Sequence, residues 1–485
     1  MNSLAKQSYI LTLPLSTEKW QEDVLFKRLE IARNIYNACL GELMKRYKRF
    51  KQDKVYRHWI QQPKSKERNQ VLRELNKEYG LNEYAIHTFV KPMQHHFKKN
   101  IDSFTAQKIA TRSWLTFEKY LYGTAKKFLF KILGDMNSVE GKTNTSGIRF
   151  KNNKLYWNGL DIPVLVKDKD IYAQLSLMDK VKYCRIVRKF IRGENRYFVQ
   201  LVLDGVPPKK VERETGKLKH HRSTGTVGID IGTQTIAVVS EGEAKLLELA
   251  SNINTMERKK RLLQRKLDRQ RRANNPHKYN DDGTIKRTND KWIISKNYLK
   301  TKGLLAEINR KIADVRKQDH NKMANWILTL GDDIKVETMN YKGLQKRTKE
   351  TTVNEKTGRI NRKKRYGKSL LNKAPSMLLT ILDNKLKYAD NKLKKIDTFK
   401  VKASQFNHFS GDYVKKTVSE WWNNLNGTKI QRDLYSAFLI MNVKDNLCEI
   451  NTKRCNEYWE AFKTSHDREI DRLRDFERTI ASMGV

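Results

Sequence analysis

The chain has 485 residues and carries 99 Lys and Arg against 54 Asp and Glu, a formal net charge of +45 at pH 7. Such an excess repels itself in a compact fold, so composition argues against an enzyme of small metabolites and favours a polyanionic partner. Binding to that partner would release counterions and depend on salt. Apolar residues make up 38% of the chain, which excludes a disordered basic tail. A structural ribosomal or chromatin protein would be basic for the same reason and stays an alternative on composition alone.

The cysteine positions and the hydropathy argue against a disulfide-bonded, zinc-binding, secreted or membrane-spanning protein. The four cysteines are scattered without a CxxC pair, so we predict neither a disulfide framework nor a zinc site; they are Cys39, Cys184, Cys448 and Cys455. Residues 1–13 are too short and polar for a signal peptide. No apolar run reaches the roughly 18 residues that a membrane span needs. We therefore expect roughly two to four domains in a protein of the cytoplasm or nucleoid, with no membrane partner.

The first half of the chain predicts a strand, a helical block and a small sheet. Residues 8–15 are typical of a short strand. From 18 to about 133 the pattern is helical, and one long helix is marked by Leu25, Leu29, Ile31, Ile35, Leu40 and Leu43. Segments between 147 and 207 alternate and are rich in β-branched and aromatic residues, which predicts an antiparallel sheet or barrel. The strand at 8–15 is a candidate member of that sheet, with the helical block inserted between.

Residues 114–131 interleave aromatic residues with lysines. The spacing predicts one amphipathic helix whose core side carries Trp114, Phe117, Leu121 and Phe128. Three lysines, Lys126, Lys127 and Lys131, are candidates for a face that follows a nucleic-acid backbone. A solvated helix face is the alternative interpretation.

Residues 226–450 predict an α/β domain. Strands are expected at 227–231 and 235–240, with a third at 245–250 and another at 333–340. A basic helix at 256–272 and a polar loop at 273–296 precede a second long helix, whose buried stripe is expected to be Leu304, Ile308, Ile312 and Val315. Residues 341–375 are a basic loop, either solvated or ordered by nucleic acid. Residues 453–485 form a charged, helical tail whose role the sequence leaves open.

Three acidic residues stand where apolar patterning would not place them. Asp230 interrupts the first strand of this domain, Glu337 ends a later strand, and Asp433 opens a helix. Burying an unpaired charge within a strand is costly, so such positions need an explanation. For the acid at the helix start, a purely structural explanation exists, because a negative charge there interacts favourably with the helix dipole. A carboxylate on a first strand, a second on a later strand and a third on a following helix is the layout of a two-metal nuclease.

The chemistry of phosphodiester cleavage explains why carboxylates would be needed. Two Mg²⁺ ions roughly 3.5–4 Å apart can activate water and stabilise the leaving oxygen. Mg²⁺ takes hard oxygen ligands and keeps several waters, so a few carboxylates and the substrate phosphate suffice. We predict Asp230, Glu337 and Asp433 as catalytic residues and ligands of two Mg²⁺ ions, for which Mn²⁺ could substitute. Gly228 and Gly232 flank Asp230 and leave room for a backbone or a metal.

Five segments, in the same order along the chain, carry a family resemblance. VGIDIGTQTIAVVS (227–240), DIKVETMNYKGL (333–344) and IQRDLYSAFLI (430–440) resemble the three RuvC motifs of the TnpB family. These are transposon-encoded RNA-guided nucleases, to which compact type V CRISPR effectors are related. RLEIARNIYNACL (28–40) resembles the N-terminal helix signature of that family, and RKQDHNKMANWIL (316–328) its stretch before the second motif. The resemblance spans about residues 8 to 450.

This resemblance implies a multidomain α+β fold. A wedge-type β-barrel (1–17 and 141–222) would be interrupted by a helical recognition lobe (18–140) and followed by an RNase H-like RuvC nuclease domain (223–402 and 430–452). Residues 403–429 would be the target-nucleic-acid-binding insertion, and 453–485 the tail. The implied partners are a guide RNA, of transposon or CRISPR origin, and target DNA in double- and single-stranded form. Base pairing would read the sequence, while the protein reads a short flanking motif. One copy or a homodimer per RNA is equally compatible.

Two positions depart from the family pattern. The family usually carries a four-cysteine zinc ribbon between the second and third motifs, whereas 403–429 contains no cysteine. One histidine, His408, cannot supply the four ligands of a structural zinc, so we expect a zinc-free remnant packed by Phe406, Phe409, Trp421 and Trp422. The third motif usually has Asn two residues after its acid, and here that place is Tyr435. Arg432 matches the arginine before the third acid and is expected to contact phosphate.

The basic helix at 256–272 is the main candidate for RNA binding. Its nine cations are Arg258, Lys259, Lys260, Arg261, Arg265, Lys266, Arg269, Arg271 and Arg272. A solvated helix face is the alternative interpretation of the same pattern. For the whole chain, an RNA-guided DNA endonuclease is the leading hypothesis. The alternatives are an RNA-guided binder with weak nuclease activity, a DNA transposase that uses the same three acids, and a structural RNA-binding protein.

Overall fold

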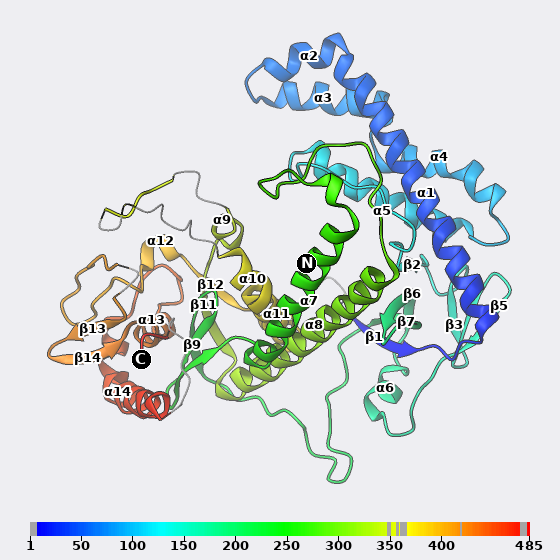
Figure 1. The fold of residues 1–485 in the computed structure, drawn as a ribbon. Helices are drawn as coiled ribbons and strands as arrows, with labels where there is room; N and C mark the ends of the chain where they lie inside the picture. The colour runs from blue at the N-terminus through cyan, green and yellow to red at the C-terminus, as the bar shows by residue number, and fades with distance from the viewer. Residues whose placement is uncertain (1–6, 347–350, 356–357, 359–365, 418–419, 476–482) are drawn as a thin grey trace. The chain divides into compact units, whose positions relative to one another are not determined.

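The computed structural model describes residues 7–346, 351–355, 358, 366–417, 420–475 and 483–485 (Figure 1). The chain divides into two compact units, Met1–Glu214 and Thr215–Val485. The first unit combines helices with two antiparallel sheets, and the second is built on a five-stranded mixed sheet. In the described part of the chain, no helix has both the length and the apolar character that crossing a membrane would require.

The larger sheet of the first unit joins the two ends of that unit. Its strand order is β1 (Ser8–Pro14), β7 (Glu194–Asp204), β6 (Val181–Ile191) and β2 (Ser138–Glu140). β1 pairs antiparallel with β7 from Ser8 opposite Asp204 to Pro14 opposite Phe198. The predicted strand at 8–15 therefore does join the later sheet, and that expectation is confirmed. Alternate residues Tyr9, Leu11 and Leu13 are buried, as the two-residue period of a half-buried strand requires.

A second, three-stranded sheet lies next in the chain. It consists of β3 (Arg149–Lys151), β4 (Lys154–Trp157) and β5 (Leu160–Pro163), followed by the short helix α6 (Ile171–Ser176). A bridge between Leu15 and Val164 links the ends of β1 and β5. The described strands thus form two linked open sheets, and the closed wedge-type barrel stays a prediction.

The helical block lies between β1 and β2 in the sequence. Its helices are α1 (Lys19–Gln52), α2 (Lys54–Gln61), α3 (Lys66–Glu78), α4 (Glu83–His96) and α5 (Ser103–Leu121). All six apolar residues that predicted a long helix are buried in α1. Arg28 of α1 donates to the carbonyls of Trp157 and Asn158, each over 2.6 Å, and the Trp157 indole donates to Asp102 over 2.9 Å. These bonds tie α1 and the start of α5 to the three-stranded sheet.

The predicted helix over 114–131 is wrong in its second half. α5 ends at Leu121, and Gly123 has a φ of +71°, a left-handed conformation that favours glycine and stops a helix. Phe128 still packs edge-on against Phe117, with ring centroids 5.9 Å apart. Lys126, Lys127 and Lys131 therefore belong to a non-helical segment and form no helix face. The Lys131 ammonium lies 5.5 Å from the ring centroid of Tyr36 on α1.

The sheet of the second unit places the three acids. Its order is β10 (Ala244–Glu248), β9 (Thr235–Val239), β8 (Thr226–Ile231), β11 (Asp333–Glu337) and β12 (Lys394–Ile396). β8, β9 and β10 are antiparallel neighbours, whereas β11 and β12 run parallel to β8. All four strands predicted in this domain from the sequence are present.

Helices cover both faces of this sheet. One face packs against α8 (Lys296–Leu330) and α11 (Pro375–Lys387), and the other against α13 (Arg432–Met441) and α14 (Thr452–Arg474). Because side chains alternate along a strand, Val227, Ile229 and Ile231 enter the first core. Gly228 and Asp230 therefore face α13. The shorter elements of the unit are η1 (Ser251–Ile253), η2 (Pro276–Lys278), α9 (Tyr341–Leu344), α10 (Gly367–Lys373), α12 (Thr398–Val401), β13 (Trp422–Leu425) and β14 (Thr428–Gln431).

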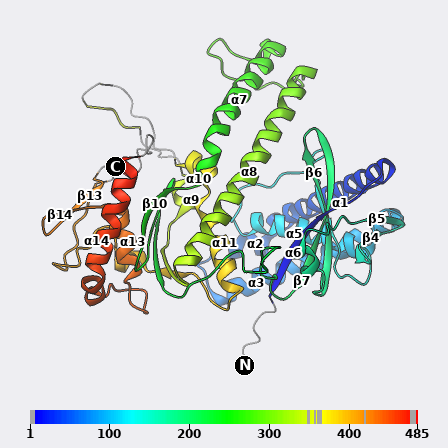
Figure 2. The same ribbon diagram turned by 90° about the horizontal axis from the view of Figure 1, so that it is seen from below.

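The helices α7 (Asn254–Asn274) and α8 form a long hairpin (Figure 2). α7 has no buried residue, and seven of its nine predicted RNA-binding cations are exposed, while Lys260 and Arg271 are half-buried. Ile308 and Ile312 are buried on α8 as predicted, but Leu304 is 52% exposed, because the packed cluster around η1 reaches only Leu305 on that side. The loop at the tip is ordered by polar contacts, since the buried Asn275 side chain bonds Ile293 through both its amide and its carbonyl.

Candidate active site

The register of β8 and β11 brings two of the acids side by side. The last paired residues of these parallel strands are Ile229 and Val336. Asp230 and Glu337 follow them directly, each at the carboxyl end of its strand. Asp230 is the only residue of β8 that is not fully buried, because its side chain faces the edge of the core beneath α13. Ligands in open α/β sheets bind at the carboxyl ends of strands, which makes this edge a natural site.

The third acid reaches the same place through a close helix contact. A side chain at Gly228 would overlap the backbone of α13 at Ala437 and Met441, so α13 lies directly on β8. Asp433 and Ala437 are four residues apart and share one face of the helix. Asp433 is therefore directed toward the Asp230 end of β8. Gly228 was predicted to leave space beside Asp230, and the backbone of α13 occupies that space.

The pKa shift of Asp230 indicates that the three carboxyl groups lie close together. Burial raises the pKa of Asp230 well above its usual value, and the charges of Asp433 and Glu337 raise it further, while Arg432 opposes them. Burial likewise raises the pKa of Glu337 and that of Asp433, where Arg432 again opposes the shift. Three mutually repelling acids in one buried place destabilise the fold unless cations or protons neutralise them.

The donor set fits hard divalent cations. All three side chains offer carboxylate oxygens, which Mg²⁺ and Mn²⁺ prefer. Among the residues that the structure describes, no group of three or more His, Cys, Asp or Glu side chains is arranged around a single ion. The three acids are thus not preformed as the shell of one ion, and a bound Mg²⁺ would take one or two carboxylates and complete its shell with water and phosphate.

Arg432 is held in place by Glu420 and Trp421, which precede α13 in the chain. Its Nε lies 3.1 Å from Oδ1 of Asp433, and its Nη1 donates to the Glu420 carbonyl over 3.0 Å. Its guanidinium carbon lies 4.8 Å from the centroid of the Trp421 ring. The side chain is mostly buried, so the cation is fixed beside the acids and leaves further N–H groups for a phosphate.

The start of α13 is fixed by residues that sequence reasoning missed. The Gln431 side chain accepts from the backbone N–H of Leu434 over 2.8 Å and caps the helix. The backbone N–H of Gln431 donates to Nε2 of His466 over 2.9 Å, and Nδ1 of His466 bonds Asp467 over 2.8 Å. His466 lies on α14, so the charged tail is part of this core. Its immediate neighbours, residues 463–469, are all polar or charged, and no motif marks it.

The segment 403–429 is joined to α13 through Tyr435. His408 is buried in a cluster of rings, with its centroid 4.0 Å from Phe409 and 5.0 Å from Trp459. Burial lowers the pKa of His408 to about 4. Of the aromatic residues predicted to pack the insertion, Phe406 is buried and Trp422 packs against the same core. Phe409 is 37% exposed, and Trp421 packs beneath Arg432.

Tyr341 is a further residue beside the acids. It opens α9, four residues after Glu337. Burial raises the pKa of Tyr341 to about 12, and the charges of Asp230 and Glu337 contribute. Sequence analysis missed it although it lies within the segment 333–344, because nothing in that segment distinguishes this tyrosine from its neighbours.

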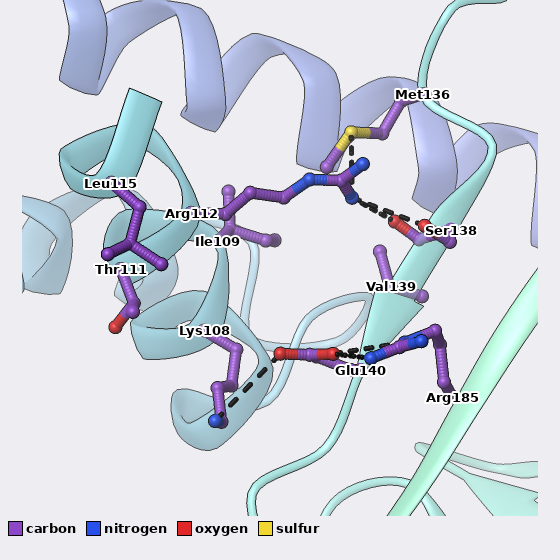
Figure 3. Close-up of a pocket in the computed structure, with 10 residues that line it drawn as sticks. All are labelled: Lys108, Ile109, Thr111, Arg112, Leu115, Met136, Ser138, Val139, Glu140 and Arg185. Atoms are coloured by element: carbon purple, nitrogen blue, oxygen red, sulfur yellow. Dashed lines mark hydrogen bonds and ion pairs between the residues drawn. The ribbon is translucent and has the colours of Figure 1, made fainter. Parts of the chain in front are cut away.

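The first unit contains a separate cavity of about 330 Å³ between α5 and β2 (Figure 3). Glu140 lies on its wall between Arg185, at 2.7 Å, and Lys108, at 3.8 Å. Arg112 donates to the Ser138 carbonyl over 3.1 Å. None of the three acids lines it, so it is not the site of the proposed chemistry.

Comparisons with known proteins found similar solved structures but no matching family model or curated protein. No protein-family model matches the sequence, and no curated protein matches it. A solved Cas12f1–sgRNA–target DNA complex is similar over 88% of this chain and 83% of that chain, with 12% identity and a TM-score of 0.47. A CRISPR–Cas12f ternary complex is similar over 88% of this chain and 82% of that chain, with 13% identity and a TM-score of 0.27. Both TM-scores lie below 0.5, so fold and site rest on the geometry above.

Proposed function

We propose that this protein is an RNA-guided DNA endonuclease with an RNase H-like RuvC domain in residues 223–402 and 430–452. The observation that carries the proposal is the gathering of Asp230, Glu337 and Asp433 from two parallel strands and a helix at one sheet edge. Their repulsion favours cation binding, and the net charge of +45 favours a nucleic-acid substrate. A structural RNA-binding protein would have no use for buried, mutually repelling acids.

In this mechanism Asp230, Glu337 and Asp433 would hold two divalent cations at the sheet edge where the scissile phosphate would bind. The bound cations would lower the pKa of an attacking water and stabilise the leaving oxygen. Arg432, fixed between Asp433 and Trp421, supplies a positive charge where the phosphorane-like transition state gains negative charge. The close contact of α13 with Gly228 holds Asp433 near Asp230 and Glu337.

The proposed partners are a guide RNA and complementary DNA. The exposed cations of α7 would follow a nucleic-acid backbone, because most of that helix presents charge to solvent and none of its residues is fully buried. Base pairing to the guide would select the target, next to a short flanking motif that the protein reads. Mg²⁺ is the proposed cation, and Mn²⁺ would substitute for it.

The test begins with the protein purified from cells that carry its native locus. Copurifying RNA is sequenced, and the complex is incubated with Mg²⁺ and a plasmid library that matches this RNA. We expect one discrete small RNA and guide-dependent cutting beside a short motif. The Asp230→Ala variant should keep RNA and DNA binding and lose cutting by at least about a thousandfold.

Other results lead to different functions. A discrete RNA with DNA binding but no cutting by the wild type would make the protein an RNA-guided binder. Joining of DNA ends without any RNA would make it a transposase. Full cutting by the Asp230→Ala variant would contradict the assignment of the acids.

A further inference from the structure

The hydroxyl of Tyr341 is buried and has no hydrogen-bond partner among the residues that the structure describes. A buried hydroxyl normally finds a partner, because leaving it unpaired costs folding free energy. A phenylalanine at this position would fill the same space without the cost of an unpaired hydroxyl. An unpaired tyrosine hydroxyl therefore points to a partner that is absent from the folded chain alone.

The surroundings of this hydroxyl indicate where that partner binds. Tyr341 begins α9 four residues after Glu337 ends β11, and the charges of Asp230 and Glu337 both act on its hydroxyl. Two acceptors are thus nearby, yet neither carboxylate accepts from the hydroxyl in the described structure. A ligand that lies between the hydroxyl and the carboxylates would satisfy all three groups.

The backbone holds Tyr341 at this place. β11 ends at Glu337, and the next side chain, Thr338, donates to the Ile396 carbonyl over 3.1 Å. Asn340 then accepts from the Gly343 N–H over 2.8 Å, which closes the turn of α9. The segment from the second acid to Tyr341 is therefore anchored to β12 and capped locally.

We propose that the Tyr341 hydroxyl donates a hydrogen bond to a non-bridging oxygen of the scissile phosphate. This inference rests on the proposed nuclease function and adds a substrate-contacting residue to it. A neutral hydroxyl is a poor replacement for a carboxylate as a cation ligand, whereas it is a good donor to phosphate oxygen. The cations held by Asp230 and Glu337 would bring that oxygen to the hydroxyl.

The deciding variant is Tyr341→Phe, which removes one oxygen atom and keeps the ring. With the guide RNA bound, we expect its single-turnover cutting rate to fall by about a hundredfold to a thousandfold, the range for loss of one donor to a developing oxyanion. Affinity for target DNA without divalent cations should stay within about twofold of wild type. The thermal midpoint of the free protein should be unchanged or higher, because the lost group was unpaired.

A phosphorothioate target provides a readout that a structural role would not move. Sulfur in place of one non-bridging oxygen weakens a hydrogen bond to that position. We expect one diastereomer to slow wild-type protein more than it slows Tyr341→Phe, so the two changes are not additive. Tyr388→Phe is the matched control, since Tyr388 is a partly buried tyrosine of the same unit at the end of α11. It should cut at the wild-type rate.

The outcomes separate this inference from the function on which it rests. Wild-type protein that cuts no guided target overturns the proposed function, and the inference with it. Wild-type cutting together with an unchanged rate or unchanged phosphorothioate response in Tyr341→Phe overturns the inference alone. A lower thermal midpoint for Tyr341→Phe in the free protein also overturns it, because the hydroxyl would then have a structural partner.

Discussion

The hydroxyl of Tyr435 bonds twice to His408. It accepts from the backbone N–H of His408 over 3.1 Å and lies 2.7 Å from ring Nδ1. The hydroxyl oxygen has two acceptor positions, so the second bond can run from the hydroxyl to a bare Nδ1 or from Nδ1–H to the hydroxyl. Tyr435 thus joins the helix of the third acid to an insertion that has no cysteine. Tyr435, which stands where asparagine was expected, therefore contacts the single histidine of the cysteine-free segment 403–429.

Tyr435→Phe should destabilise the protein by about 1–3 kcal/mol, because it leaves a buried backbone N–H and a ring nitrogen without their partner. The free energy of unfolding from urea titration measures this loss. Tyr458→Phe on α14 is the control, since that tyrosine is only partly buried and should change stability by less than about 0.5 kcal/mol. Equal stability of the two variants would contradict a structural role for the Tyr435–His408 contact.

Acid should weaken the fold through the same histidine. Burial lowers the pKa of His408 from 6.5 to about 4 in the folded chain. The unfolded chain therefore binds a proton more readily, and the His408 contribution is complete above pH 6.5 and is lost as the pH falls toward 4. The loss is at most about 3 kcal/mol.

Other groups titrate in the same range and must be separated from His408. His466 and His320 also have lowered pKa values and act in the same direction. Asp230, Glu337 and Asp433 have raised pKa values, so their protonation in acid favours the folded state. Unfolding curves of wild type and His408→Phe from pH 7 to pH 4.5 isolate the one group. A parallel loss of stability in both proteins would assign the effect elsewhere.

Local pattern and order of elements were readable from the sequence. The apolar stripe of α1, the strands around Asp230 and Glu337 and the helix at Asp433 each carry their own periodicity. The return of β1 to β7 followed from alternation in two distant segments. The end of α5 was missed because the aromatic spacing continued past Gly123, where backbone conformation overrides side-chain pattern.

Contacts made by polar residues far apart in the chain could not be predicted. His466 supports Gln431 across 35 residues, and His408 meets Tyr435 across 27. Neither histidine stands in a motif, and histidine is intermediate between core and surface, so its type alone predicts no burial. The exposure of Leu304 was missed for a related reason. Helical spacing predicts which residues share a face, but the neighbouring elements decide how far along the helix that face is covered.

The cations of α7 should determine much of the salt dependence of RNA binding. Arg258, Arg261, Arg265 and Arg269 are exposed and recur at three- and four-residue spacing on one helix face. Changing these four to Glu should reduce the slope of log affinity against log salt by about 3, if each meets one phosphate of a single-stranded or A-form backbone. Binding of the copurified RNA at several salt concentrations gives this slope.

A matched control keeps the same change in net charge. Lys64, Lys66, Arg73 and Lys77 in and beside α3 are also exposed, and none was predicted to bind RNA. Their replacement by Glu should lower affinity through overall charge and leave the slope closer to wild type. If both variants give the same slope, α7 is a solvated face and the RNA lies elsewhere.

Divalent cations should stabilise the folded protein through the acid cluster. Without cations the carboxyls of Asp230, Glu337 and Asp433 raise one another's energy, so replacing one by a neutral isostere should relieve repulsion. We expect Asp230→Asn to raise the stability of the cation-free protein by on the order of 1 kcal/mol. Mg²⁺ should raise the thermal midpoint of wild type in a concentration-dependent way, because a ligand that binds only the folded state stabilises it.

The variant and its control make the test specific for this cluster. Asp230→Asn should show little further gain from Mg²⁺, whereas Asp412→Asn, at an exposed acid of the insertion, should respond as wild type does. Ca²⁺ is a useful second cation, because its larger radius and looser geometry support binding without the octahedral demand of Mg²⁺. A wild-type midpoint that does not move with either cation, or an Asp230→Asn variant that gains as much as wild type, would remove the basis for placing the metal ions at these acids.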